Sequence, residues 1–242
     1  MPIPRCRNRR KQRNEGRACH RRAGHLDPLR DRRRGPPTNL VRPGYGAEPV
    51  SRALVLFAHP CAESFSAALH KRVVDRLQGA GWQVDDCDLN AEGFDPVLGE
   101  AERRGYHTLE DNTRPVAEYV ARLRAAEALV MVFPVWNFGY PAILKGFLDR
   151  VFLPGVSFRL EAGKVRPNLT HIRKLAAVTT YGGTRMRALL AGDPPRKCVT
   201  RALWHVCRPE KMRYLALYDM NRASDVRRAG FLSRVGQEME TF

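Results

Sequence analysis

The stretch ALVMVFPVWNFGYPAILKGFLDR, residues 128–150, constrains the fold more than any other part of the chain. Its first six residues, 128–133, are all apolar, which is typical of a strand buried on both faces of a sheet. Pro134 has no N–H to donate, so we expect it to end the strand. Pro141 suits the first turn of a helix, where a missing N–H costs nothing. The pattern predicts a buried strand, a loop and a helix over 141–152.

The loop between this strand and this helix is rich in aromatic residues, namely Trp136, Phe138 and Tyr140. In open α/β sheets, ligands bind outside the carboxyl ends of the strands. An aromatic loop at that place suits a flat, conjugated ligand that needs stacking partners and backbone hydrogen bonds. The alternative is that the rings only pack against neighbouring loops, and this segment alone favours neither interpretation.

Strand and helix signals alternate from residue 52 onward. The predicted strands are 53–58, 82–88, 128–133, 174–180 and 213–218, and the predicted helices are 65–77, 115–126, 141–152, 184–190, 195–206 and 223–240. We expect 90–111 to be irregular and 154–170 to be a loop with a short hairpin around 161–164. This alternation predicts an α/β fold, a doubly wound five-stranded parallel sheet with right-handed crossovers.

The chain divides by charge into two parts. Residues 1–48 hold 14 Lys/Arg and 4 Asp/Glu, with few large apolar residues and no helical or strand period. Such a segment cannot bury enough surface to offset chain entropy, so we predict a disordered basic tail over 1–48 and one folded domain over 49–242. We favour an inert tail over an arm that binds nucleic acid, because charge alone gives only non-specific attraction.

Cysteines and apolar runs exclude several classes of protein. None of the six cysteines forms a CxxC pair, so we expect no iron–sulfur centre and a reduced, cytoplasmic setting. Cys6, Cys19, His20 and His25 match no usual zinc spacing, and we expect no metal. The longest uncharged run, 128–144, contains prolines and is too short to cross a membrane.

The junction after the first strand reads HPCAESFS, residues 59–66. It is neither GxGxxG nor a Walker loop, which excludes the usual dinucleotide motif and an NTPase. Ser64 is placed to cap the following helix, whose N-terminus favours phosphate, and Ser66 adds a hydroxyl. The alternative is that Ser64 is only a cap and His59 only a polar loop residue. Taken alone, the junction favours capping.

The fourth strand ends in TTYGG, residues 179–183. Paired glycines let the backbone approach a ligand, although a simple turn into the next helix is the alternative. In a sheet of strand order 2-1-3-4-5, the loops after strands one, three and four are neighbours. A phosphate at the first loop and a flat ring between the other two make one coherent site for a flavin nucleotide.

Three segments together make the chain resemble the flavodoxin-like NAD(P)H:quinone reductases of the DT-diaphorase type and their bacterial relatives, which include ancillary oxidoreductases of potassium efflux systems. They are ALVLFAHPCAESFS at 53–66, FPVWNFGYPAILKGFLDRVF at 133–152 and TTYGG at 179–183. The resemblance implies a flavodoxin-like fold and a set of residues that contact the flavin: His59, Ser64, Phe65, Ser66, Pro134, Val135, Trp136, Asn137, Phe138, Thr179, Thr180, Tyr181, Gly182 and Gly183.

One departure from the family concerns catalysis. Members of the DT-diaphorase type carry a tyrosine and a histidine after the TTYGG-like loop, and these are proposed to assist hydride transfer. The segment TRMRALLAGDPPR, residues 184–196, contains neither. Tyr181 and Arg185 are our candidates for this catalytic role.

The sequence therefore predicts a flavoenzyme, an NAD(P)H dehydrogenase (quinone)-like protein that reduces quinones or similar electrophiles by two-electron hydride transfer. The resemblance implies non-covalent FAD or FMN, NAD(P)H as co-substrate and a homodimer, with no specific nucleic acid. One alternative is a flavin-binding ancillary subunit of a potassium efflux system, with a membrane transporter as partner. The other is a non-enzymatic basic binding protein. The sequence leaves open FMN against FAD, NADH against NADPH, and the acceptor.

Overall fold

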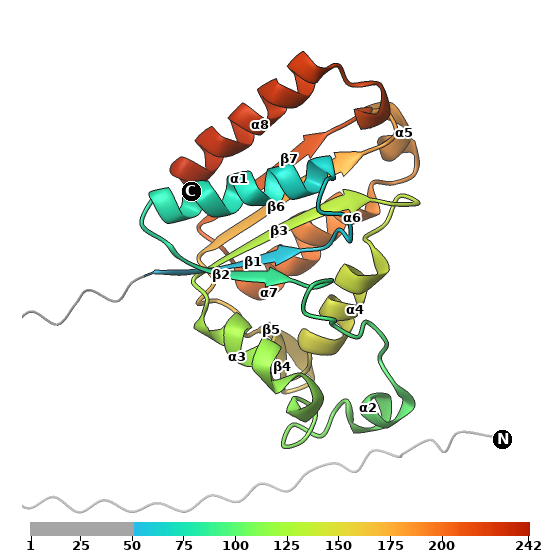
Figure 1. Ribbon diagram of the computed structural model, residues 1–242. Coiled ribbons are helices and arrows are strands. Elements are labelled where there is room, and N and C mark those ends of the chain that lie inside the picture. The colour runs from blue at the N-terminus through green and yellow to red at the C-terminus, as the bar shows by residue number, and fades with distance from the viewer. Residues whose placement is uncertain (1–50) are drawn as a thin grey trace, which may run out of the picture. The chain divides into compact units, whose positions relative to one another are not determined.

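The computed structural model of the protein describes residues 51–242 (Figure 1). The predicted tail over residues 1–48 lies outside the described residues, as do Cys6, Cys19, His20 and His25. None of the helices between residues 51 and 242 is long and apolar enough to cross a membrane.

A five-stranded parallel sheet forms the centre of the domain, in the order β2-β1-β3-β6-β7 (Figure 1). This order confirms the predicted 2-1-3-4-5 arrangement, because β6 and β7 are the fourth and fifth strands of this sheet. β1, β3 and β6 lie inside it and are almost entirely buried, which explains their unbroken apolar runs. The strands are β1 (Arg52–Phe57), β2 (Gln83–Asp88), β3 (Ala128–Val135), β6 (Lys174–Tyr181) and β7 (Lys211–Leu217).

Helices cover both faces of the sheet, as the predicted doubly wound fold requires. Helices α1 (Phe65–Gly79) and α8 (Asp225–Glu240) share one apolar core with one face. In α1 the core residues Leu69, Val73 and Leu77 recur every four positions, so that they form one stripe. The other face packs against α3 (Ala117–Ala125), α4 (Ala142–Val151) and a continuous helical run made of α6 (Pro194–Lys197), η2 (Cys198–Leu203) and α7 (Trp204–Cys207).

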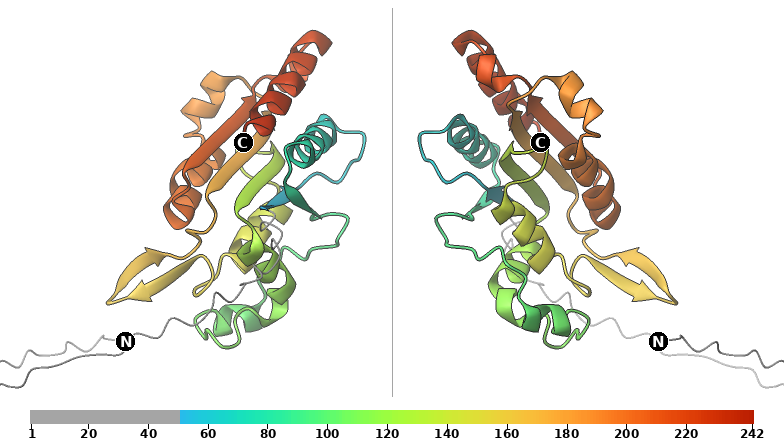
Figure 2. Two further views of the ribbon diagram at one scale, coloured as in Figure 1. Left: turned by 90° about the vertical axis from the view of Figure 1, so that its left-hand side faces the viewer. Right: turned by 90° about the vertical axis from the view of Figure 1, so that its right-hand side faces the viewer.

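The shorter elements lie around these layers. Strands β4 (Phe158–Glu161) and β5 (Lys164–Pro167) form the expected antiparallel hairpin, which projects from the domain (Figure 2). The remaining pieces are η1 (Arg114–Val116), α5 (Arg185–Leu190) and η3 (Met220–Arg222). Residues 90–111 are not wholly irregular, because α2 (Glu100–Gly105) forms there. The Glu102 carboxylate accepts a hydrogen bond from the N–H of Gly99 and pairs with Arg150, which fixes this helix start.

The prediction that Pro134 ends the third strand is wrong. β3 continues through Pro134, which pairs with Thr180, and Val135 pairs with Tyr181. The pairing of β3 with β1 stops at Val132, whose carbonyl accepts the N–H of Ala58. Successive residues of a strand turn their N–H groups to opposite sides, so the nitrogen of Pro134 faces the side on which β1 has already ended. No ladder bond is lost there. Pro141 is likewise the N-cap of α4 rather than a residue of its first turn.

Candidate functional site

The chain reverses direction immediately after β3, over residues 136–139. The N–H of Trp136 donates to the carbonyl of Gly139 at 3.2 Å, and the N–H of Gly139 donates back at 2.8 Å. Between them, Asn137 and Phe138 have φ angles of 48° and 56°, the pattern of a two-residue type I′ turn. Asparagine tolerates this conformation, but a phenylalanine in it is strained. The turn presents the rings of Trp136 and Phe138, which are 45% and 42% exposed.

Tyr181, the last residue of β6, is buried and held on three sides. Its ring stacks on Tyr218, with 4.5 Å between the ring centroids. Its hydroxyl donates to Asp193 Oδ1 at 2.6 Å and lies 2.6 Å from the hydroxyl of Tyr214. Burial raises the pKa of Tyr181 well above its usual value, and Tyr214 and Asp193 raise it further. The hydroxyl therefore stays protonated, and Tyr181 contributes its ring and its backbone to the loop after β6.

A cavity of about 220 Å³ lies between the turn after β3 and the loop after β6. Every residue that lines it was singled out from the sequence: Val135, Asn137, Phe138, Tyr181, Gly182 and Gly183. The register of β3 with β6 accounts for this, because Val135 and Tyr181 are direct partners at the ends of the two strands. A Cβ built on Gly182 would lie 3.1 Å from Asn221 Nδ2, so a side chain there would crowd the loop.

The loop before α1 adjoins the turn after β3. The ring of His59 meets Trp136 edge-on, with 5.7 Å between centroids, and His59 Nδ1 accepts the N–H of Cys61. Ser64 is the N-cap of α1, and its Oγ accepts the N–H of Ala67 at 3.0 Å. The N–H groups of Phe65 and Ser66 have no acceptor among residues 51–242. The capping function of Ser64 thus leaves two free donors at this helix start.

The other predicted site residues lie deeper or farther out. Pro134, Thr179 and Thr180 are buried in β3 and β6, and Thr179 Oγ1 has no hydrogen-bond partner in the described part of the chain. Arg185 begins α5 and is exposed, and its side chain pairs with no carboxylate of residues 51–242. The structure therefore places Arg185 at the rim of the cavity loops rather than in the cavity lining.

Three further residues at this edge were missed by the sequence analysis. Asn221, in η3 after β7, contacts the place where a Gly182 side chain would be, and the N–H of Asp219 donates to the carbonyl of Gly183 at 2.8 Å. The side chain of Arg187 lies over Gly183. The rule that ligands gather at the carboxyl ends of strands, applied to β7, would have pointed to the segment around Asn221.

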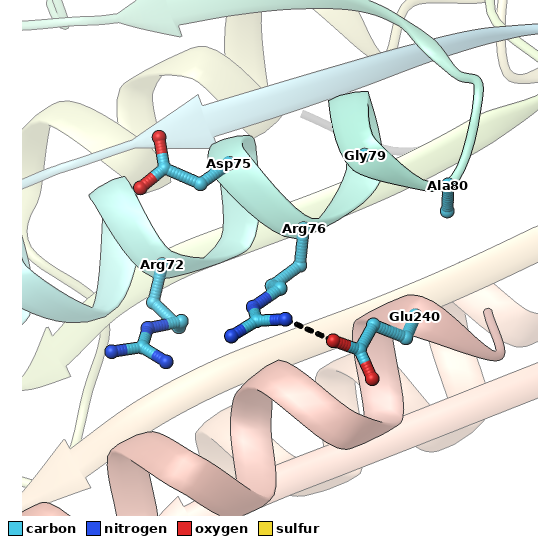
Figure 3. Close-up of a pocket in the computed structure, with 6 residues that line it drawn as sticks. All are labelled: Arg72, Asp75, Arg76, Gly79, Ala80 and Glu240. Atoms are coloured by element: carbon cyan, nitrogen blue, oxygen red, sulfur yellow. Dashed lines mark hydrogen bonds and ion pairs between the residues drawn. The ribbon is translucent and has the colours of Figure 1, made fainter.

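A larger groove, of about 610 Å³, lies at the opposite end of α1 (Figure 3). It is formed by the last turns of α1 and α8, where Arg76 pairs with Glu240. Arg72 and Asp75 complete its charged lining. It contains none of the predicted site residues and no aromatic ring, so its chemistry differs from that of the cavity after β3 and β6.

The cysteines of the described residues do not join the cavity lining. Cys61 is exposed, whereas Cys87 and Cys207 are buried. Burial raises the pKa of Cys87 well above its usual value and that of Cys207 to about 12. Both therefore remain thiols rather than nucleophilic thiolates. No group of three or more His, Cys, Asp or Glu within residues 51–242 is arranged to hold a metal ion.

The strand order and the loops at the carboxyl ends of the strands define a class of protein. This class is the doubly wound α/β domains, which bind ligands in a cleft at the topological switch point. A family profile described as a flavodoxin-like fold matches residues 51–238, and the chain belongs to this family. The resemblance predicted from the sequence is thereby confirmed.

Similar proteins include the rat NAD(P)H dehydrogenase [quinone] 1, which is 30% identical over 156 residues, 58% of this chain and 57% of the rat protein. The chain thus spans a little over half the length of that relative. An uncharacterized NAD(P)H oxidoreductase of Haemophilus influenzae is 24% identical over 192 residues, 77% of this chain and 93% of its own.

Among solved structures, Smu.1420 of Streptococcus mutans superposes with a TM-score of 0.70 at 27% identity, covering 79% of this chain and 100% of that one. An NAD(P)H:quinone oxidoreductase of Methanothermobacter marburgensis shares the fold, with a TM-score of 0.69, 24% identity and coverage of 79% and 98%.

Proposed function

We propose that the protein is a flavin-dependent NAD(P)H oxidoreductase that reduces quinones or similar electrophiles by two-electron hydride transfer. The observation that carries the proposal is the cavity between the turn after β3 and the loop after β6, which is lined by two glycines and two aromatic residues, Phe138 and Tyr181, among others. The name of the rat relative, NAD(P)H dehydrogenase [quinone] 1, supports the same activity, and the name of the Haemophilus relative supports an NAD(P)H oxidoreductase.

The residues present fit a flavin. The exposed rings of Trp136 and Phe138 offer an apolar surface to a flat ring system, and Gly182 lets the backbone come close to its polar edge. When bound, a flavin supplies the hydride chemistry that no side chain of the protein provides. The chain has to orient the ring, exclude water from one of its faces and stabilise charge on its polar edge.

The start of α1 fits the phosphate side of FMN or FAD. The free N–H groups of Phe65 and Ser66 lie at the positive end of the helix dipole, which attracts an anion. The contact of His59 with Trp136 joins this helix start to the ring site. Phosphate and ring would then lie on adjoining loops, as one nucleotide requires.

Charge on the polar edge would be stabilised by the loop after β6. The backbone of Gly182 and Gly183 lines the cavity and would provide the polar contacts. We keep Tyr181 and Arg185 as candidates that assist hydride transfer, Tyr181 as a positioning residue and Arg185 as a catalytic one. The hydroxyl of Tyr181 already donates to Asp193, so its effect is to hold the loop, and Arg185 would act through its positive charge.

The assembly and setting are also part of the proposal. We propose a homodimer, because the exposed Trp136 and Phe138 would be covered by a second subunit beside the flavin. We also propose a cytoplasmic setting, which the free cysteines of residues 51–242 support. Light scattering of the purified protein at micromolar concentration tests the homodimer. A monomer with full activity would exclude a site shared between subunits.

An absorption spectrum of the purified protein tests the proposal as a whole. We expect the bands of an oxidised flavin, bleaching on addition of NADH or NADPH, and recovery on addition of a quinone. Chromatography of the released flavin distinguishes FMN from FAD. A colourless protein that takes up neither flavin and does not oxidise NAD(P)H would overturn the proposal. A flavoprotein with little turnover that co-purifies with a membrane transporter would favour the ancillary-subunit alternative.

A further inference from the structure

The short helix α5 turns an apolar face to solvent. Met186, Leu189 and Leu190 are 63%, 67% and 80% exposed, whereas Ala188 is buried and anchors the helix. Positions i, i+3 and i+4 of a helix lie side by side, so these three side chains form one continuous surface. Within residues 51–242, nothing packs against this surface, which we call the α5 apolar face.

Positive charge is concentrated in the stretch of chain that contains the α5 apolar face. Residues 182–201 contain five basic side chains and a single acidic one, Asp193, which is buried and accepts a hydrogen bond from Tyr181. None of the five pairs with a carboxylate of the described residues. They are Arg185, Arg187, Arg196, Lys197 and Arg201. Arg185 and Arg187 lie on α5 itself, and Lys197 Nζ lies 3.7 Å from the Cβ position of Gly192, just after the helix. An apolar patch with unpaired cations beside it matches a surface whose interior is apolar and whose outer layer is anionic.

The α5 apolar face also lies beside the candidate flavin site. α5 starts two residues after Gly183, which lines the cavity, and the side chain of Arg187 lies over that glycine. Figure 1 shows α5 next to the carboxyl ends of β6 and β7, the same edge of the sheet. A surface that held α5 would therefore lie close to the mouth of the cavity.

We propose that the α5 apolar face docks on an anionic lipid bilayer. Met186, Leu189 and Leu190 enter the headgroup region, and the cations on α5 and just after it contact lipid phosphates. This inference rests on the proposed function and refines it, because the acceptor class then becomes quinones dissolved in the bilayer.

A second copy of the chain is a less suitable occupant. In a contact around a twofold axis, Arg185 and Arg187 would approach their own copies, and like charges repel. Three side chains also provide far less apolar area than the ~800 Å² per partner that a stable protein interface buries. Docking on a bilayer requires neither acidic residues of the chain that complement these arginines nor a large buried area on one protein face.

Vesicle sedimentation of the full chain tests the inference without any enzyme assay. The chain should co-sediment with phosphatidylcholine vesicles that contain phosphatidylglycerol, and about tenfold more weakly with phosphatidylcholine alone or at high salt. The triple variant Met186→Ser, Leu189→Ser and Leu190→Ser should lose about tenfold in binding to the anionic vesicles.

A matched control removes as many exposed apolar side chains elsewhere. Leu160→Ser and Val165→Ser on the β4–β5 hairpin, with Val226→Ser on α8, should leave vesicle binding unchanged. Lys197→Gln with Arg201→Gln should reduce binding to anionic vesicles only. Both apolar triple variants should keep their reduction rates with a water-soluble quinone, and only the α5 variant should slow on a quinone held in vesicles.

Three outcomes would overturn the inference. The first is that the chain does not bind anionic vesicles, and the second is that the hairpin variant loses as much binding as the α5 variant. The third is that the α5 substitutions lower the molecular mass measured by light scattering while vesicle binding persists, which would assign the face to a second copy of the chain. A protein that binds vesicles through α5 but takes up no flavin would leave the docking intact and refute only the proposed function.

Discussion

At the scale of single residues, Phe138 occupies a backbone conformation that usually requires glycine. Type I′ turns favour Asn-Gly at their centre, and this chain has Asn137 followed by Phe138 at a φ of 56°. A β-carbon in this conformation costs about 1–2 kcal/mol, an expense that a glycine would avoid. Strain of this kind is common where a side chain must be presented to a ligand. The ring of Phe138 is 42% exposed at the cavity, which fits that explanation.

We therefore expect Phe138→Gly to stabilise the flavin-free protein and to weaken flavin binding. The gain should be about 0.5–1 kcal/mol, since relief of the strain is partly offset by the entropy of glycine. Urea unfolding of the flavin-free protein and fluorescence titration with flavin measure the two effects. Asn137→Gly is the control, because it relaxes the same turn but keeps the ring. Lower stability with unchanged flavin affinity would make Phe138 a packing residue only.

A charge at the start of α1 should repel a phosphate. Ser66→Asp places a carboxylate beside the free N–H groups of Phe65 and Ser66, and flavin binding should weaken by about 1–3 kcal/mol. Ala68→Asp is the control, because it adds the same charge on an exposed position of the same helix. Because Ser66 is buried, thermal melting of both flavin-free variants is needed to distinguish a folding defect from a direct loss of flavin binding. Equal flavin affinity in the two variants would place the phosphate elsewhere.

The sequence predicts individual site residues where local chemistry decides their position. The TTYGG loop and the turn after β3 were found because glycines and aromatics follow buried strands. The Tyr181–Asp193–Tyr214 cluster was not, since it depends on β6 pairing with β7 and on the left-handed conformation of Asp193, at a φ of 46°. Such contacts between distant segments leave no periodic signal in the sequence.

At the scale of elements, α4 packs closely against the segment before α2. A Cβ on Gly146 of α4 would lie 2.3 Å from the backbone oxygen of Pro96. Phe94 packs on Phe147, and Arg150 donates to the carbonyl of Asp95. The polar composition of residues 90–111 suggested a wholly irregular segment, and only these contacts with α4 reveal how firmly its first part is held.

We expect Gly146→Ala to destabilise the fold by about 1–3 kcal/mol or more, because the added methyl group collides with backbone. Gly230→Ala is the matched control. Gly230 lies within α8 with open space around it, so alanine should stabilise that helix by about 0.5–1 kcal/mol. Urea unfolding curves of both variants give the comparison. A neutral Gly146→Ala would mean that α4 and the Pro96 segment can move apart at little cost.

At the scale of the whole molecule, most of the excess of basic residues lies in residues 1–48, before the alternating apolar segments that predict the strands and helices. The sheet, its helices and the cavity loops are all built from residues 51–242. A chain that begins at Pro49 should therefore keep the melting temperature and flavin content of the full chain. Differential scanning calorimetry and the flavin-to-protein absorbance ratio measure both. A melting point many degrees lower would show that the first 48 residues stabilise the domain.

The arrangement of the two cavity loops also predicts the order of the proposed reaction. The turn over 136–139 and the loop from Tyr181 to Gly183 would cover one face and the polar edge of a flavin ring, which leaves the opposite face for both substrates. Nicotinamide and quinone would then use the same space in turn, and the oxidised nucleotide must leave before the acceptor enters. We expect a ping-pong mechanism.

Initial rates at several fixed quinone concentrations should give parallel double-reciprocal lines against NAD(P)H. The oxidised nucleotide should compete with the quinone, since both bind the reduced enzyme at one place. Phe138→Gly alters the covered face only, so it should lower flavin content without changing this pattern. Lines that intersect would show both substrates bound together, and the turn and loop would then have to leave room for a second pocket beside the ring.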